Sequence, residues 1–383
     1  MIKRQTQQFN AALYQWLVTL TLALPGLIMA DTPPGWINAN NDSAYTTTRG
    51  ELALSIAGLK VNDTIDFLDI REDLLAGDRR LEGDSGDLSG LRIALDFGVT
   101  EWLSLFYREQ RHALRVELGE ISSVNVIDID RDLETTAREA GLKWTFYAAD
   151  LFNPGGRHTA ASLEVSAFRN SSESFDVIAD QLRFRNVELF FSEPRTFSVN
   201  QLEDDGWQAR LLFSRALSGS AVGSAWLGYK DSEARAATDT NIDSVTVNRL
   251  FKQAFRLKED FLKAGLSLNF NLAPRLPLLL SYEFIRSNSA SFTRDPAEPV
   301  ESLPGFLRGR APAADSNHTL YVRASYWLTP TLSVALSGNL YSNQFLGLLP
   351  HYNNPLSGSF ADKPYGYAGI ELSYLLRDLF GNR

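Results

Sequence analysis

FLKAGLSLNFNLAPRLPLLLSYEF, residues 261–284, contains two runs of alternating apolar and polar residues that meet at a short turn, Ala273-Pro274-Arg275. In the first run one face carries leucine, alanine and phenylalanine, and the other carries lysine, glycine, serine and asparagine. Successive strand side chains point to opposite faces, so this period of two predicts a β-hairpin. The apolar face is long and uncharged, which is typical of a strand with lipid outside and a polar lumen inside.

The composition excludes several classes of protein. The chain has 383 residues, no cysteine and a formal net charge of −9. The lack of cysteine removes thiolate metal sites and cysteine nucleophiles, and it suits export to an oxidising compartment. A net negative charge without a basic cluster argues against nucleic-acid binding. The sequence contains no phosphate-binding glycine loop or dinucleotide fingerprint, so we expect no cofactor.

The N-terminus has the pattern of a secretory signal peptide. Lys3 and Arg4 precede a short apolar run, 16–24, and the small residue Ala30 precedes a polar segment. The run is shorter than the ~20 residues that a membrane span needs, so we expect cleavage after Ala30. The predicted organisation is a signal peptide (1–30), a periplasmic lead-in (31–48) too short for a plug domain, a transmembrane β-barrel (49–376) and a C-terminal tail (377–383).

The alternating pattern recurs along the mature chain, for example at 91–99, 142–148, 207–214 and 320–328. Short turns and long loops alternate between these segments, as they do in transmembrane barrels. We count about twelve strands, or fourteen if stretches such as 181–191 form further strands. The predicted fold is therefore all-β, an antiparallel up-and-down transmembrane barrel, in which closure pairs every backbone donor and acceptor.

The signal peptide, the ten-residue strands and the C-terminal strand YGYAGIELSYLL together resemble Gram-negative outer-membrane β-barrel proteins of the porin or channel kind. The resemblance implies a bacterial outer-membrane location with both termini periplasmic. It also implies contact with outer-membrane lipid and lipopolysaccharide, and insertion by the barrel assembly machinery. Such proteins usually end on an aromatic residue of the last strand, whereas this strand ends at Leu376; Phe380 is another candidate for the assembly signal.

Ionisable residues on the predicted inward face fall at similar heights above the short turns. The candidate lumen and selectivity residues are Arg92, Asp96, Arg108, Lys143, Glu164, Arg210, Lys263, Glu283, Arg323 and Glu371. The ion pairs expected between neighbouring strands are Lys143 with Glu164, Glu164 with Arg210, and Glu283 with Lys263 or Arg323. These charges either neutralise one another in a filled lumen or form a belt that sorts permeating solutes. Small inward residues such as Gly98 and Gly265 leave room on one side and favour passage.

The sequence thus favours a channel or transport barrel that passes small polar solutes, with the inward charges setting selectivity. The alternative is a plugged structural or surface-interaction barrel whose long loops bind a partner or lipopolysaccharide. A lipid-modifying enzyme is the third reading, since outer-membrane phospholipase A is also a twelve-stranded barrel. Its His-x-Ser-Asn-Gly motif follows none of the four histidines, His112, His158, His318 and His351. We therefore predict no enzyme, and His318 beside Asn317 is the one histidine worth testing.

An acidic run in a predicted extracellular loop gives a weak metal-ligand pattern. Asp128, Asp130, Asp132 and Glu134 alternate, and such oxygen ligands suit Ca²⁺. The glycine that an EF-hand loop requires is missing. We interpret the run as a solvated loop and predict no metal site.

Overall fold

The computed structural model describes residues 42–61, 85–116, 124–128, 131–149, 159–184, 187–243, 252–295, 316–341, 365–377 and 379. The strands in these ranges are β1 (Leu52–Val61), β2 (Ser85–Thr100), β3 (Leu103–Val116), β4 (Val124–Asp128), β5 (Arg131–Ala149), β6 (Thr159–Ser172), β7 (Phe175–Phe184), β8 (Val187–Ser218), β9 (Ala221–Thr240), β10 (Gln253–Ala273), β11 (Leu276–Asp295), β12 (Ser316–Trp327), β13 (Leu332–Tyr341) and β14 (Tyr365–Leu376). Among the described residues, no helix has the length and apolar character to cross a membrane. The predicted signal peptide, the lead-in up to residue 41 and Phe380 lie outside the described residues.

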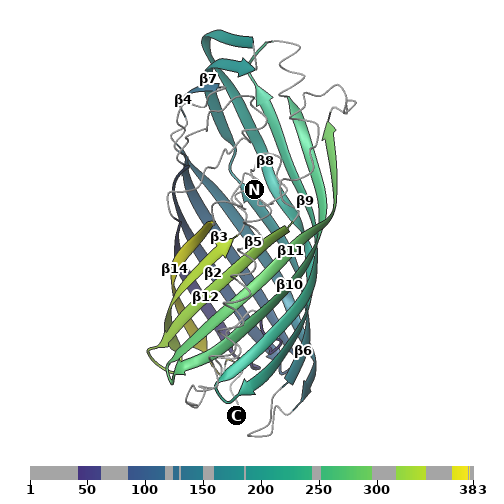
Figure 1. Ribbon diagram of the computed structural model, residues 1–383, viewed down its shortest axis with the longest axis vertical. Coiled ribbons are helices and arrows are strands. Elements are labelled where there is room, and N and C mark those ends of the chain that lie inside the picture. Colours follow the sequence, from purple (N-terminus) through teal and green to yellow (C-terminus); the bar gives the residue numbers. More distant parts are fainter. Residues whose placement is uncertain are drawn as a thin grey trace, which may run out of the picture.

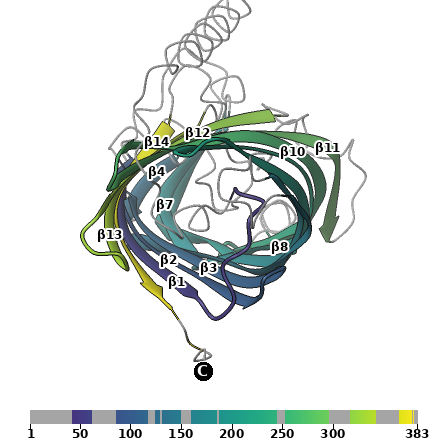
Figure 2. The ribbon, with the colours of Figure 1, turned by 90° about the horizontal axis from the view of Figure 1, so that it is seen from below.

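Twelve strands close into an antiparallel barrel (Figure 1, Figure 2). The ring runs from β8 through β6, β5, β3, β2, β1, β14, β13, β12, β11 and β10 to β9, and β8 pairs with β9 to complete it. Leu52 at the start of β1 pairs with Leu376 at the end of β14, so both ends of the barrel lie at the rim of the short turns. The predicted fold is confirmed, and closure leaves no free sheet edge in the ring.

The strands β4 and β7 do not enter the ring. The first part of β8 pairs with β7 and its second part pairs with β6, so the sheet continues beyond the barrel at the end away from the short turns (Figure 1). The stretch 181–191, which the sequence offered as a possible further strand, is instead the end of β7 and the start of β8. The reason is that the chain reverses between Phe184 and Val187, which pair with each other.

The outer wall is apolar and the inner wall is polar. Leu227, Leu266 and Ile370 are 65 %, 60 % and 64 % exposed, whereas Ser162 and Glu164 on the inner face are 0 % and 1 % exposed. A soluble protein has the opposite distribution, and so wide an apolar surface would drive aggregation in water. The wall is therefore built to face lipid.

Aromatic side chains mark both edges of the apolar band. Trp102 and Tyr326 are exposed near the short turns, and Trp207 of β8 contacts Tyr229 of β9 at 5.5 Å between ring centroids, farther up the wall. Such belts are typical of the two membrane interfaces. Trp327 does not belong to them, because it packs against a buried cluster inside the barrel.

Candidate functional site

The residues before β1 lie inside the lumen. We call residues 42–48 the strap; Figure 2 shows this purple segment turning from β1 into the barrel. Ser43 and Ala44 are 1 % and 0 % exposed. The strap begins to diverge from the wall at Gly50, whose φ of 74° lies in the left-handed region that favours glycine.

Side chains of three strands bind the strap backbone. Lys143 Nζ of β5 donates to the Ser43 carbonyl at 2.9 Å, and the hydroxyls of Thr145 and Ser162 donate to the Ala44 carbonyl. The Ala44 amide donates to Ser214 Oγ of β8 at 2.7 Å. Buried peptide groups need such partners, and this part of the lumen wall supplies them.

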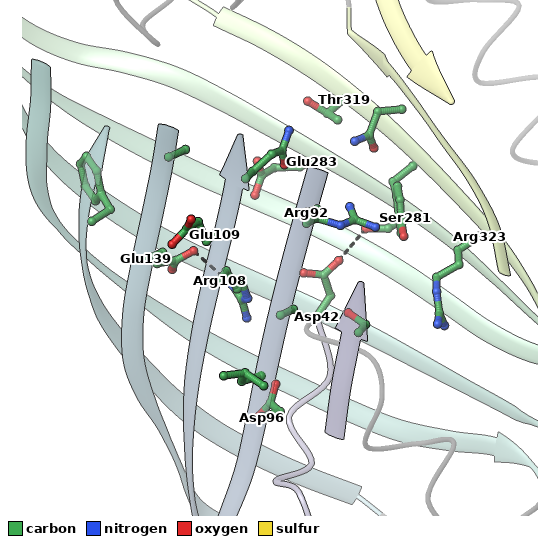
Figure 3. Close-up of a pocket in the computed structure, with 18 of the residues that line it drawn as sticks. Asp42, Arg92, Asp96, Arg108, Glu109, Glu139, Ser281, Glu283, Thr319 and Arg323 are labelled. Atoms are coloured by element: carbon green, nitrogen blue, oxygen red, sulfur yellow. Dashed lines mark hydrogen bonds and ion pairs between the residues drawn. The ribbon is translucent and has the colours of Figure 1, made fainter. Parts of the chain in front are cut away.

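The inner end of the strap is held from two sides of the barrel. Asp42 Oδ1 lies 3.1 Å from Arg210 Nη1 of β8, and Asp42 Oδ2 accepts a hydrogen bond from Ser281 Oγ of β11 at 2.9 Å (Figure 3). Around the ring β8 is five strands and β11 four strands from β1, where the strap begins, so the strap crosses the lumen to the far part of the wall. Near it, Tyr45 belongs to a buried apolar cluster with Leu212.

The strap departs from the expectation for this part of the sequence. The lead-in was predicted to lie in the periplasm, but its described residues are inside the barrel. Their sequence, Asp-Ser-Ala-Tyr-Thr-Thr-Thr, is polar and turn-rich, and it is buried only because the inner wall is polar too. The sequence of the strap alone does not show that the wall around it is also polar, so its burial could not be predicted from that sequence.

Glu164 is the centre of a buried ion-pair cluster. Arg210 Nη2 lies 2.6 Å and Lys143 Nζ 3.7 Å from its carboxylate, and Arg108 Nη2 lies 4.0 Å away. Lys143, Glu164 and Arg210 are register partners across β5, β6 and β8, so the two ion pairs predicted among them are confirmed. An unpaired carboxylate buried this deeply would strongly destabilise the barrel. This explains why three cationic side chains surround Glu164.

A second cluster surrounds Glu371 of β14. Arg92 and Arg323 each reach its carboxylate at 2.8 Å. The predicted pairing of Arg323 with Glu283 is wrong in the described residues, because the register sets Glu283 opposite Thr319 and shifts Arg323 along β12. The other predicted partner, Lys263, donates to Gln208 Oε1 at 3.0 Å.

A cavity of about 500 Å³ lies between the two clusters, with Asp42 of the strap among its lining residues. Eight of the ten candidate lumen residues also line it: Arg92, Asp96, Arg108, Arg210, Lys263, Glu283, Arg323 and Glu371. The other two, Lys143 and Glu164, are buried in the first cluster. Figure 3 shows Arg92 and Asp96 of β2 and Glu283 of β11 among the residues that line the cavity.

Several inward residues of the cavity were not predicted from the sequence. Glu139 pairs with Arg108 at 3.2 Å, and Gln208 and Lys230 also line the cavity. Glu139 has the same parity as Lys143, so the period of two would have included it if the strand had been extended upward. Asp42 gave no such signal, because it precedes the strands.

The small inward residues Gly98 and Gly265 were predicted to leave open room in the lumen, and this prediction is wrong. A Cβ added at Gly98 would overlap the carbonyl oxygen of Thr48, and one added at Gly265 would overlap the Trp226 indole. The space beside these glycines is therefore filled by the strap and by a large aromatic side chain. Glycine at both positions permits that close approach.

The other candidates from the sequence do not assemble into a site. His318 lies on the wall, where its Nδ1 is 2.7 Å from the Tyr282 hydroxyl. The acidic run is divided, with Asp128 on β4 and Asp132 and Glu134 on β5, while Asp130 is outside the described residues. Among described residues, no group of three or more His, Cys, Asp or Glu is placed to hold a metal ion.

Comparisons with known proteins give low similarity in sequence. No protein-family model and no curated protein matches the chain. Solved structures that resemble it include the NanC porin, with 6 % identity, a TM-score of 0.39, and coverage of 84 % of this chain and 98 % of that one. The Pseudomonas putida toluene transporter TodX has 9 % identity, a TM-score of 0.43, and coverage of 90 % and 94 %. The translocator domain of the autotransporter NalP from Neisseria meningitidis has 10 % identity, a TM-score of 0.45, and coverage of 86 % and 89 %.

The physical features of the barrel lead to its class. The ring is closed, its outer band is apolar between two aromatic edges, and its interior holds charges and a cavity. Only closed barrels and helices can cross a bilayer with every backbone group paired. The chain is a transmembrane β-barrel.

Proposed function

We propose that the barrel is a channel for small polar solutes and that the strap closes it in the conformation described above. The observation that carries the proposal is the charged cavity of about 500 Å³ bordered by a segment that spans the lumen. A purely structural barrel needs neither a charged cavity nor a separate segment across it. We further propose that the rim of the short turns, where β1 begins and β14 ends, faces the periplasm.

Unused hydrogen-bond donors in the cavity support a solute pathway. Arg108 Nε and Arg323 Nε are buried and have no hydrogen-bond partner among the described residues. A buried guanidinium donor without a partner is costly, and oxygens of water or of a passing solute would satisfy it. The balance of arginines and carboxylates in the two clusters would replace part of a solute's hydration shell without trapping it.

The decisive experiment locks and releases the strap. The sequence has no cysteine, so a disulfide between Ala44→Cys and Ser214→Cys would be the only one. The 2.7 Å hydrogen bond between these residues keeps their Cα atoms within about 6.5 Å, inside the range of disulfides. In planar bilayers we expect no conductance when the pair is oxidised and channel openings after reduction. The single variants Ala44→Cys and Ser214→Cys should show no redox dependence.

The alternative function is a permanently plugged barrel that interacts with a partner through its loops. The observation that favours it is the set of contacts between the strap and the wall, which would seal the lumen if the strap were never released. Liposome swelling separates the two. A channel should admit a small sugar with the reduced double-cysteine protein and exclude it after oxidation. A plugged barrel should exclude the sugar in both states, and this result would overturn the proposed function.

A further inference from the structure

A band of charged residues lies on the outer wall beyond the apolar band, on the side away from the short turns. Its members face outward because they share the parity of exposed apolar residues on the same strands, as Arg138 does with Leu142 and Arg169 with Val165. We call this band the collar, and its residues are Glu109, Arg111, Arg138, Arg169, Glu203, Asp205, Glu233, Arg235, Arg256 and Lys258. None of them belongs to the two ion-pair clusters of the lumen.

On β3, β5 and β6 the cations of the collar are exposed and the nearest carboxylates are covered. The side chains of Arg111, Arg138 and Arg169 are 61 %, 53 % and 69 % exposed, against 10 % for Glu109 and 26 % for Glu203. Glu109 lies 2.6 Å from Arg111 and 3.3 Å from Arg138, and Glu203 lies 2.9 Å from Arg169. Each guanidinium is therefore oriented by a carboxylate and has further donors directed outward.

Two of these exposed cations face each other across neighbouring strands. Arg138 of β5 and Arg169 of β6 are register partners, and like charges directly opposite each other destabilise a sheet. An anion bound between the two guanidinium groups would remove the repulsion. Arginine is suited to this role, because its planar fork binds phosphate oxygens in pairs.

The wall below this pair fits a lipid. Ala140 and Ala167 are the next outward residues towards the apolar band; they are also register partners and are exposed. Leu142 and Val165 follow, again in register. Cations at the edge of an apolar surface match an amphiphile that has a phosphate headgroup and acyl chains.

We propose that Arg111, Arg138 and Arg169 form a binding site for the headgroup phosphate of an outer-leaflet glycolipid, namely lipopolysaccharide, with an acyl chain lying against Ala140 and Ala167. The sequence predicted contact with this lipid through the long loops. The structure assigns it to the strand wall. The three side chains lie on the outer face of the wall, so the site does not depend on the proposed channel function, but its place in the outer leaflet rests on the proposed orientation with the short turns towards the periplasm.

The test measures lipid binding to the full mature protein in detergent micelles by native mass spectrometry. The probes are bisphosphorylated lipid A and the same lipid with its phosphates removed. We expect Arg138→Gln or Arg169→Gln to weaken binding of the phosphorylated lipid about tenfold, and the double variant to weaken it more, because each removes charge-assisted hydrogen bonds. The matched control is Arg275→Gln, which removes an exposed arginine at the opposite rim and should leave binding unchanged.

A second variant separates the arginine fork from simple charge. Arg138→Lys with Arg169→Lys keeps both charges but loses paired donors, and we expect binding between that of the wild type and the glutamine double variant. The dephosphorylated lipid should bind all variants equally and weakly. Wild-type affinity in the glutamine double variant would overturn the proposal, as would an equal loss in Arg275→Gln, because the latter would indicate nonspecific attraction.

Discussion

Asp42→Ala tests how firmly the strap is held. The carboxylate forms an ion pair with Arg210 and accepts a hydrogen bond from Ser281, and its side chain is 21 % exposed. Hydrogen bonds to charged groups contribute roughly 1.5–3 kcal/mol to stability. Because the Asp42 carboxylate is partly exposed to solvent, we place its contribution near the lower end of that range. Removing it should favour the released strap by about 1.5 kcal/mol, which is roughly a tenfold change in the ratio of closed to open channels.

Single-channel recording in planar bilayers measures that ratio directly. We expect the open probability of Asp42→Ala to rise about tenfold while the conductance of each open channel stays the same, because the open pathway has not changed. Arg49→Gln, at the exposed end of the segment, is the control and should behave as the wild type. Heat-modifiable migration on a gel verifies that both variants fold. An unchanged open probability in a folded Asp42→Ala barrel would refute the view that the strap is a gate.

Three further changes test other contacts. Gly98→Ala adds a Cβ that overlaps the Thr48 carbonyl and should raise the open probability, whereas Gly58→Ala, with open space at its Cβ, should not; equal recordings for the two would contradict the close approach. Lys143→Met removes a cation 3.7 Å from Glu164 and should destabilise the barrel by about 3 kcal/mol, seen as a lower temperature of heat-modified migration. Neutralising Arg210 and Arg323 together to glutamine should shift the reversal potential in a salt gradient towards cation preference, since the carboxylates around them remain; an unshifted potential would argue that these arginines do not face the permeating ions.

The sequence was sufficient for the barrel and for most of its lining, because both follow from a local rule. A period of two assigns each residue to one face, so the alternation alone places Glu164 and Arg210 inside. Register is less local. The position of Glu283 relative to Arg323 depends on the pairing of β11 with β12, and turn positions alone gave the wrong partner. The strap has no periodic pattern, so its place in the lumen could not be predicted.

The nature of the strap contacts argues for release rather than a permanent seal. Three of them are hydrogen bonds between strap peptide groups and the hydroxyls of Thr145, Ser162 and Ser214, which water in a polar lumen would replace, so each contributes only about 0.5–1.5 kcal/mol net. The strap has no apolar core of its own, and Tyr45 is its one large buried side chain. It also stays covalently joined to β1 at Gly50, so its release and return are intramolecular and fast enough for gating. A folded plug domain would have to unfold or leave as a unit, whereas this segment need only exchange a few hydrogen bonds and the ion pair of Asp42 with Arg210.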